Sequence, residues 1–369
     1  MNKFRFLTSG ESHGMCLNAI IEGLPANVAI DNDFINQELA KRQQGYGRGA
    51  RMQIETDKAQ IKSGVRFGKT TGAPVCIEIQ NKDWQNWTVP MSIEPVDIKD
   101  PDVAEAVNAK KITRVRPGHA DLAGAQKYNQ KDIRNILERS SARETASRVA
   151  VGAIAKCFLK EFGINGSSKV LQIGNSFDEE EMKQEIDKAK ENGDTLGGRF
   201  EITFKNIPAG LGSFVHWDRR LDGRLAQALM SIPAVKAVEI GAGCLCSALQ
   251  GSKTHDEIFY DTENSKYYRK TNNAGGIEGG MTNGEDVVLK VTMKAIPTMK
   301  QPLQSVDIET KSPYCAHFER SDTCAVEACA IVGEAMAAIV LADAFLEKFG
   351  GDSIEETKRN FNSYTENLE

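Results

Sequence analysis

Two histidines stand in short turns bounded by glycine. His13 follows Ser12 in GESHG (10–14), and His119 follows a Pro-Gly pair in RPGHAD (116–121). Imidazole exchanges protons near neutral pH, and a serine hydroxyl can bond a phosphate or the edge of a flavin. The Pro-Gly turn places His119 at a helix start, where the helix dipole disfavours positive charge. The alternatives are a plain turn with a hydrogen-bonded His13 and a helix-capping His119.

A run of arginines and serines, ERSSARETASR (138–148), precedes an apolar segment. Arg139 and Arg143 are four residues apart, which predicts that they share one helical face. Ser140 and Ser141 are mildly unfavourable inside a helix unless their hydroxyls bond something. A solvated Arg/Glu face is the alternative. Because the segment runs into a buried helix, we expect its arginines to need anionic partners.

Two further basic motifs suit an anionic ligand. Arg42, Arg48 and Arg51 are spaced by glycines that let backbone amides approach an anion, although a nucleic-acid loop could look similar. In RSD, Arg320 could pair with a phosphate. Asp322 is there either a functional carboxylate or the N-cap of the last helix. These groups together indicate a ligand with several negative charges and a chemistry of proton transfer.

Other common sites are not predicted. The glycines of 272–280 and Gly241-x-Gly243 do not complete a dinucleotide fingerprint, and no Walker A sequence occurs. Cys244 and Cys246 have no histidine partners at zinc spacing, so we predict no metal site. We therefore do not expect a Rossmann fold.

The hydrophobic pattern predicts an α+β fold in layers rather than a regular βαβ array. Residues 132–162 read as one long helix with a buried second half, and another helix runs from Asp322 to about Phe349. We expect a single domain over 1–350 and a polar, frayed tail over 351–369. The segment 81–112 reads as a surface excursion. The remaining predicted elements are helices at 33–44, 178–192 and 218–231, and strands at 17–24, 59–66, 73–80, 199–206 and 286–296.

Composition is that of an ordinary soluble protein, with 369 residues, 40% apolar and 26% charged. The net charge of −5 argues against a general nucleic-acid binder. We find no signal-peptide core and no stretch approaching about 20 apolar residues, and the scattered cysteines suit reduced thiols. We therefore expect a cytoplasmic protein without a membrane segment.

Several long motifs resemble one family, chorismate synthase, in order along essentially the whole chain. They are GESHGMCLNAIIEGLP (10–25), RPGHADLAGAQKY (116–128), ERSSARETASRVAVGAIAK (138–156), PAGLG (208–212), ALMSIPAVKAVEIGAG (228–243), NNAGGIEGGMTNG (272–284) and RSDTCAVEACAIVGEAM (320–336). The resemblance implies a layered β-α-β sandwich and a homotetramer that binds FMN near subunit contacts. It also implies a carbon–oxygen lyase reaction. Phosphate and a proton leave 5-enolpyruvylshikimate 3-phosphate in an anti 1,4-elimination that gives chorismate with no net redox change.

The resemblance also assigns roles to residues that match its motifs. The catalytic group would be His13, His119, Asp322, Ser12 and Ser141. Reduced FMN would contact Arg139, Ser140, Ser141, Pro233, Ala234, Gly279, Lys294, Ala295, Ile296, Pro297, Thr298 and Arg320. The substrate phosphate and carboxylates would be held by Arg42, Arg48, Arg116, Arg143 and Arg320. NADPH is a possible reductant in the family, associated with the first two of these arginines.

The departures from the family pattern are small. Lys294 begins K-A-I-P-T where K-P-I-P-T is frequent, and Pro233 stands where asparagine is common, so a contact there must be apolar or through the backbone. Two other functions stay open. A flavin-dependent NAD(P)H oxidoreductase would consume nicotinamide in step with product, and a polyanion-binding module would bind in a salt-sensitive way without chemistry.

Overall fold

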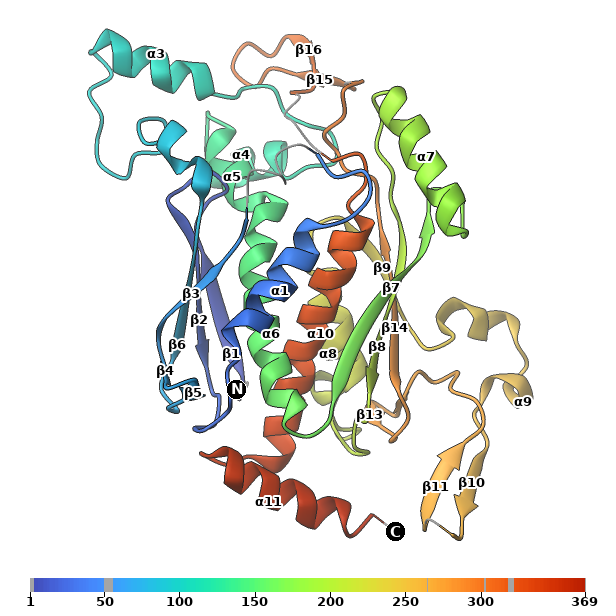
Figure 1. Cartoon of the computed structure of the whole chain (residues 1–369). Helices are drawn as coiled ribbons and strands as arrows, with labels where there is room; N and C mark the ends of the chain where they lie inside the picture. The colour runs from blue at the N-terminus through green and yellow to red at the C-terminus, as the bar shows by residue number, and fades with distance from the viewer. Residues whose placement is uncertain (1–2, 50–55, 264, 302, 318–321, 369) are drawn as a thin grey trace.

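The computed structural model describes the chain except residues 1–2, 50–55, 264, 302, 318–321 and 369. In the described part, two four-stranded sheets enclose a layer of helices (Figure 1). One sheet has the order β1 (Arg5–Ser9), β2 (Cys16–Glu22), β6 (Val75–Gln80) and β3 (Ala59–Ser63). The other has the order β7 (Asn165–Ile173), β8 (Gly198–Lys205), β14 (Val287–Met293) and β9 (Val235–Ile240). The helices between them are α1 (Asn32–Gln43), α6 (Thr145–Lys160), α8 (Leu221–Met230) and α10 (Val326–Phe349). The predicted β-α-β sandwich is therefore confirmed.

The core follows from the sequence pattern. β14 buries every second residue, as a strand with one face on the helix layer must. α6 and α10 are buried nearly all round because both lie between the sheets. Gly152 lets these two helices approach, since a Cβ atom there would lie 2.4 Å from that of Ala335.

One prediction about apolar stretches is wrong. α10 is long and apolar enough to cross a membrane, with a mean hydropathy of 2.0 in its most apolar window. However, 89% of that window is buried inside the sandwich. The composition of α10 is explained by its central position in the core.

The single helix predicted over 132–162 is also wrong, because the chain breaks at Ser141. α5 (Arg134–Ser140) ends there, a 3-10 turn (η2, Ala142–Glu144) follows, and α6 then begins. Ser141 is extended at φ −65° and ψ 142°, and its hydroxyl accepts a hydrogen bond from the backbone N–H of Arg143 at 3.3 Å. Such a local bond competes with helix continuation. Arg139 and Arg143 therefore do not share a helical face.

The C-terminal segment is helical rather than frayed. α11 (Ile354–Thr365) starts with a capping box between Ser353 and Glu356. Phe361 packs against Phe345 at a ring-centroid distance of 5.5 Å. Local capping and this aromatic contact order a segment whose composition alone looks polar.

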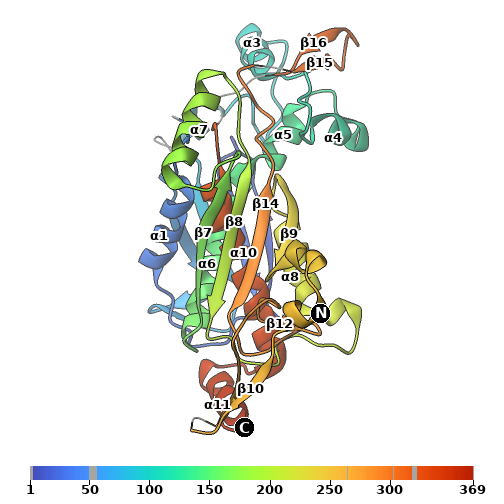
Figure 2. The same ribbon diagram turned by 90° about the vertical axis from the view of Figure 1, so that its right-hand side faces the viewer.

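The other described elements are short and lie mainly at the ends and edges of the sandwich. α3 (Pro101–Lys110), α4 (Asp121–Tyr128), α5 and the β15–β16 hairpin gather at one end, and α11 lies at the opposite end (Figure 2). A small second core of Ile112, Val115, Ala125, Ile133 and Leu137 supports the first group. The remaining bounds are β4 (Val65–Arg66), β5 (Lys69–Thr70), η1 (Lys82–Asn86), α7 (Glu179–Glu191), η3 (Trp217–Arg219), η4 (Gly243–Ala248), α9 (Gly251–Thr254), β10 (Ile258–Asp261), β11 (Lys266–Arg269), β12 (Ile277–Glu278), β13 (Met281–Thr282), β15 (Gln304–Val306) and β16 (Pro313–Cys315).

Candidate active site

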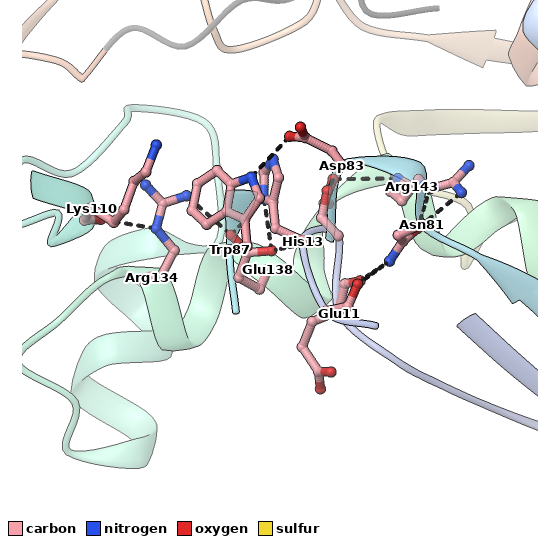
Figure 3. Close-up of polar contacts among 12 residues, drawn as sticks. Glu11, His13, Asn81, Asp83, Trp87, Lys110, Arg134, Glu138 and Arg143 are labelled. Carbon is pink, nitrogen blue, oxygen red and sulfur yellow. Dashed lines mark hydrogen bonds and ion pairs between the residues drawn. The ribbon is translucent and has the colours of Figure 1, made fainter. Parts of the chain in front are cut away.

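The GESHG turn joins β1 to β2 and is fastened to the end of α5. Gly10 has φ +102°, and a Cβ atom there would lie 2.3 Å from the carbonyl oxygen of Cys16. Glu138 accepts hydrogen bonds from the backbone N–H of His13 at 2.8 Å and from its Nδ1 at 2.9 Å. The hydroxyls of Ser12 and Ser141 are 3.4 Å apart. Three of the predicted catalytic residues therefore lie together (Figure 3 draws His13 and Glu138).

Glu138 fixes which nitrogen of His13 holds a proton. Burial raises the pKa of Glu138, but hydrogen bonds from His13 and Arg134 lower it by more, so the carboxylate is ionised. An ionised carboxylate only accepts hydrogen bonds, so Nδ1 carries the proton. Among the described residues, Nε2 of His13 has no hydrogen-bond partner, which leaves it available to a ligand.

Two buried arginines share one carboxylate beside this turn. Arg143 donates from Nη1 to both oxygens of Asp57 at 2.7 and 2.6 Å, and Arg42 Nη1 lies 3.7 Å from the same group. Burial lowers the pKa of Arg42 to about 10, Asp57 opposes this, and the charges of Arg143 and Arg48 add to the lowering. Arg42 is still protonated at neutral pH. Within the described part of the chain, its Nη1 is buried and makes no hydrogen bond.

The predicted basic loop also reaches this region. Arg48 Nη1 lies 2.8 Å from Asp322, which also accepts a bond from the N–H of Gly49 at 2.6 Å. Arg48 Nε is buried with no hydrogen-bond partner among the residues that the structure covers. Asp322 is not the N-cap of α10, because that helix begins at Val326. Arg320 and Arg51 lie outside the described residues.

The second histidine belongs to a neighbouring polar group. His119 Nδ1 lies 2.5 Å from Asp121, whose side chain is fully buried and also accepts from Arg116 Nε at 2.8 Å. Burial raises the pKa of Asp121, while hydrogen bonds from His119 and Arg116 lower it well below its usual range. Arg116 also donates to Thr298 at 3.1 Å, and Lys294 donates to the carbonyl of Gly118 at 2.5 Å. His119 does not cap α4, whose N-cap is Ala120.

Comparisons with known proteins decide the family. The family model described as chorismate synthase matches residues 4–346. Proteins named chorismate synthase from Thermoanaerobacter pseudethanolicus and Geobacter sulfurreducens are 57% and 53% identical, each with 98% of both chains covered. A solved structure titled as a crystal structure of chorismate synthase has a TM-score of 0.78 and 42% identity, over 99% of this chain and 98% of that one.

The chain belongs to the chorismate synthase family. Its activity is that of the family, a lyase of the shikimate pathway that eliminates phosphate from 5-enolpyruvylshikimate 3-phosphate to give chorismate.

The residues that the chorismate synthase motifs assign to FMN fall in different places. Ala234 adopts φ +69°, and its carbonyl accepts from the N–H of Lys294 at 2.9 Å, so Pro233–Ala234 and 294–298 lie side by side. Ile296 accepts a hydrogen bond from Thr195 through its carbonyl. The other members of this stretch are Ala295 and Pro297.

Three further assigned FMN residues, or their neighbours, make hydrogen bonds with other parts of the chain. Arg139 donates to the carbonyls of Thr8 and Gly10, and the hydroxyl of Ser140 bonds the carbonyl of Ile136 within its own helix. Gly279 precedes Gly280, whose carbonyl bonds the start of α8, whereas Ala234 follows the end of that helix. A helix of ten residues is about 15 Å long. One chain therefore does not bring Gly279 to Ala234.

Several residues of the chorismate synthase site were missed by sequence reasoning. Asp57 precedes β3 and Asn81 follows β6, and neither lies in one of the motifs described above. Trp87 lies in the segment 81–112, which was predicted to be a surface excursion. Asn81 donates to the carbonyls of Glu11 and Gly14 and accepts two bonds from Arg143, at 3.0 and 2.9 Å. A tryptophan amid polar residues was the one signal that could have marked this segment.

Proposed function

We propose that the elimination takes place at the end of the sandwich where His13, Arg42 and Arg48 meet. The observation that carries the proposal is the pair of buried guanidinium N–H groups, on Arg42 and Arg48, that have no acceptor among the described residues. Burying a donor without a partner costs about 1–3 kcal/mol. A bound phosphate or carboxylate would relieve that cost, and the substrate carries both.

The arginines would hold the substrate while the leaving phosphate gains charge. Arg143 and Arg42 present more positive charge than the single carboxylate of Asp57 neutralises. Fixed cations at a departing phosphate stabilise the transition state more than the ground state. Arg48, Arg116 and Arg320 are proposed to complete the grip on the phosphate and carboxylates.

The histidines would handle protons from Nε2. His13, held through Nδ1 by Glu138, would bond or protonate the leaving phosphate. His119, held through Nδ1 by Asp121, would maintain the protonation state of the cofactor or phosphate. Ser12 and Ser141 would position ligand by their adjacent hydroxyls, and Asp322 would assist removal of the C6 proton.

Reduced FMN is proposed as the cofactor. When bound, it supplies electron density to an allylic system whose C6 hydrogen is not acidic. The residues present suit a flavin phosphate, because burial and the charge of Lys236 lower the pKa of Lys294, and a bound anion beside this lysine would offset both effects. The proposed contacts are Arg139, Ser140, Ser141, Pro233, Ala234, Lys294, Ala295, Ile296, Pro297, Thr298 and Arg320. Gly279 would join them only from another copy of the chain.

We further propose an oligomeric state, a reductant, a cellular location and a domain organisation. A homotetramer would place FMN near subunit contacts, and NADPH would serve as reductant rather than as a stoichiometric substrate. We propose a cytoplasmic location and a single domain over 1–350, onto which α11 packs.

The test is an anaerobic assay with purified chain, chemically reduced FMN and 5-enolpyruvylshikimate 3-phosphate. Equal amounts of phosphate and chorismate with catalytic flavin support the proposal. Consumption of NAD(P)H in step with product would favour an oxidoreductase, and salt-sensitive polyanion binding without product would favour a binding module.

Variants locate the reaction within the chain. His13→Ala should lower turnover by at least about 100-fold, as expected for lost proton transfer. His216→Ala is a matched control, because His216 also pairs with a carboxylate, Asp218, at 2.7 Å but is exposed. Equal rates for the two variants would remove His13 from the mechanism.

A further inference from the structure

Trp87 lies flat against the imidazole of His13. The ring centroids are 3.9 Å apart and the planes are inclined by 27°. Trp87 is 7% exposed although it belongs to the polar segment that leads from β6 to α3. A buried tryptophan stacked on a histidine fixes the plane of both rings.

The indole is itself held on several sides. Its Nε1 donates to Asp83 at 2.8 Å, and its backbone N–H donates to the carbonyl of Trp84 at 2.9 Å. Lys110 Nζ and Arg134 Cζ lie 4.3 and 5.0 Å from the indole. In Figure 3 the indole is drawn between these two cations and His13. The indole can therefore not move away from His13 without losing these contacts.

We propose that Trp87 is a positioning residue for the reaction. It holds the His13 imidazole in the one orientation that keeps Nδ1 on Glu138 and presents Nε2 to the substrate phosphate. The proposal deepens the role proposed above for His13 and rests on it. The segment 81–112 thereby becomes part of the active site although it contributes no reacting group.

Two contacts of different kinds hold the imidazole. The bond to Glu138 directs Nδ1, and the indole covers one face of the ring, so the ring cannot turn toward that side without a clash. A misplaced catalytic group lowers turnover rather than ground-state binding. Loss of the indole should thus reduce kcat and spare KM.

The first experiment compares Trp87→Leu, Trp87→Phe and Trp84→Leu. Trp84 is the matched control, since it lies in the same segment and is half-buried. We expect Trp87→Leu to lower kcat about tenfold with KM within twofold, Trp87→Phe to retain most of kcat, and Trp84→Leu to stay near wild type. An unchanged kcat in folded Trp87→Leu, or an equal loss in Trp84→Leu, would overturn the proposal.

The second experiment needs neither substrate nor flavin. The sequence holds three tryptophans, so in a Trp84→Phe, Trp217→Phe background the emission comes from Trp87 alone. A stacked protonated imidazole quenches indole fluorescence, so adding His13→Ala should raise the emission. The comparison runs from about pH 5 to about pH 8, where histidines ordinarily change charge. Identical emission with and without His13 would refute the stacking.

The two experiments separate two failures. If His13→Ala removes the quenching but keeps full activity, the contact exists and the proposed role of His13 fails. If His13→Ala is inactive but Trp87→Leu is fully active, the role of His13 stands and the positioning role of Trp87 fails.

Discussion

Replacing Glu138 by glutamine would test how the carboxylate controls His13. Glutamine has the same length but offers one acceptor oxygen and one donor NH2 group. Glu138 receives three N–H groups, from His13 Nδ1, the His13 backbone and Arg134. An amide cannot accept all three at the present positions. If its NH2 faces the ring, Nδ1 must accept and the proton moves to Nε2.

The loss of stability in this variant follows from the burial of the Glu138–Arg134 ion pair. Glu138 and Arg134 have side-chain exposures of 1% and 8%, so their charges are poorly screened. Removing one partner of a buried pair costs about 3–5 kcal/mol. Glutamine keeps one acceptor, and Arg134 retains its bond to the carbonyl of Lys110. We therefore expect a loss near the lower end, about 3 kcal/mol, which for a chain of 369 residues is a fall of roughly 4 °C in Tm.

The effect on turnover should exceed the effect on stability. The imidazolium that would protonate the leaving phosphate needs a proton on both ring nitrogens, and an amide NH2 facing Nδ1 excludes the proton there. Proton transfer from His13 should then be lost, and general acid–base catalysis contributes about 10²–10⁴ in rate. We expect kcat to fall at least about 100-fold with little change in KM, measured as chorismate formed anaerobically. Glu11→Gln is the control, since Glu11 lies in the same turn but is exposed. A folded Glu138→Gln enzyme within threefold of wild type would refute the reasoning.

Three other predictions concern stability, each followed by thermal unfolding. The pKa of Asp121 is raised by burial but lowered more by its hydrogen bonds, so its stabilisation is present above about pH 4 and lost as pH falls. Asp121→Asn should lower Tm at pH 7 and flatten its decline in acid, and an unchanged slope would contradict this. Gly152→Val should cost about 3 kcal/mol, because its Cβ would meet Ala335, and a wild-type Tm would show that α6 and α10 can separate freely. Phe361→Ala should lower the free energy of unfolding by about 3 kcal/mol, because it removes the aromatic contacts of α11. An unchanged Tm would show that these contacts do not stabilise the fold.

The sandwich could be predicted from sequence because its elements have strong local patterns. The alternation in β14 and the apolar faces of α10 can be recognised from the sequence of each segment alone. The break at Ser141 was missed, because the apolar periodicity continues on both sides of it. The extended backbone of Ser141 and the bond from the Arg143 N–H to its hydroxyl mark the break. α11 was missed for the opposite reason, since its composition is polar and its order depends on capping and on contact with Phe345.

The motifs identified the histidines and arginines but not what holds them. Glu138 lies 125 residues from His13, and Asp57 lies 86 residues from Arg143. No local pattern encodes which carboxylate meets which cation across such separations. The role of Asn81 could not be predicted for the same reason, although this residue links the GESHG turn to Arg143.

Both histidines have the same construction, and this bears on how the site works. Each Nδ1 meets a buried carboxylate that also receives an arginine, with Glu138 and Arg134 behind His13 and Asp121 with its own arginine behind His119. Hydrogen bonds from the histidine and the arginine keep the carboxylate ionised, the carboxylate keeps the proton on Nδ1, and chemistry is confined to Nε2. The two differ, because the carboxylate of His119 is two residues away and Arg116 Nη2 also lies 3.1 Å from its Nδ1, while the carboxylate of His13 comes from α5. Distortion of the α5–α6 break should therefore disable His13 first and leave His119 oriented.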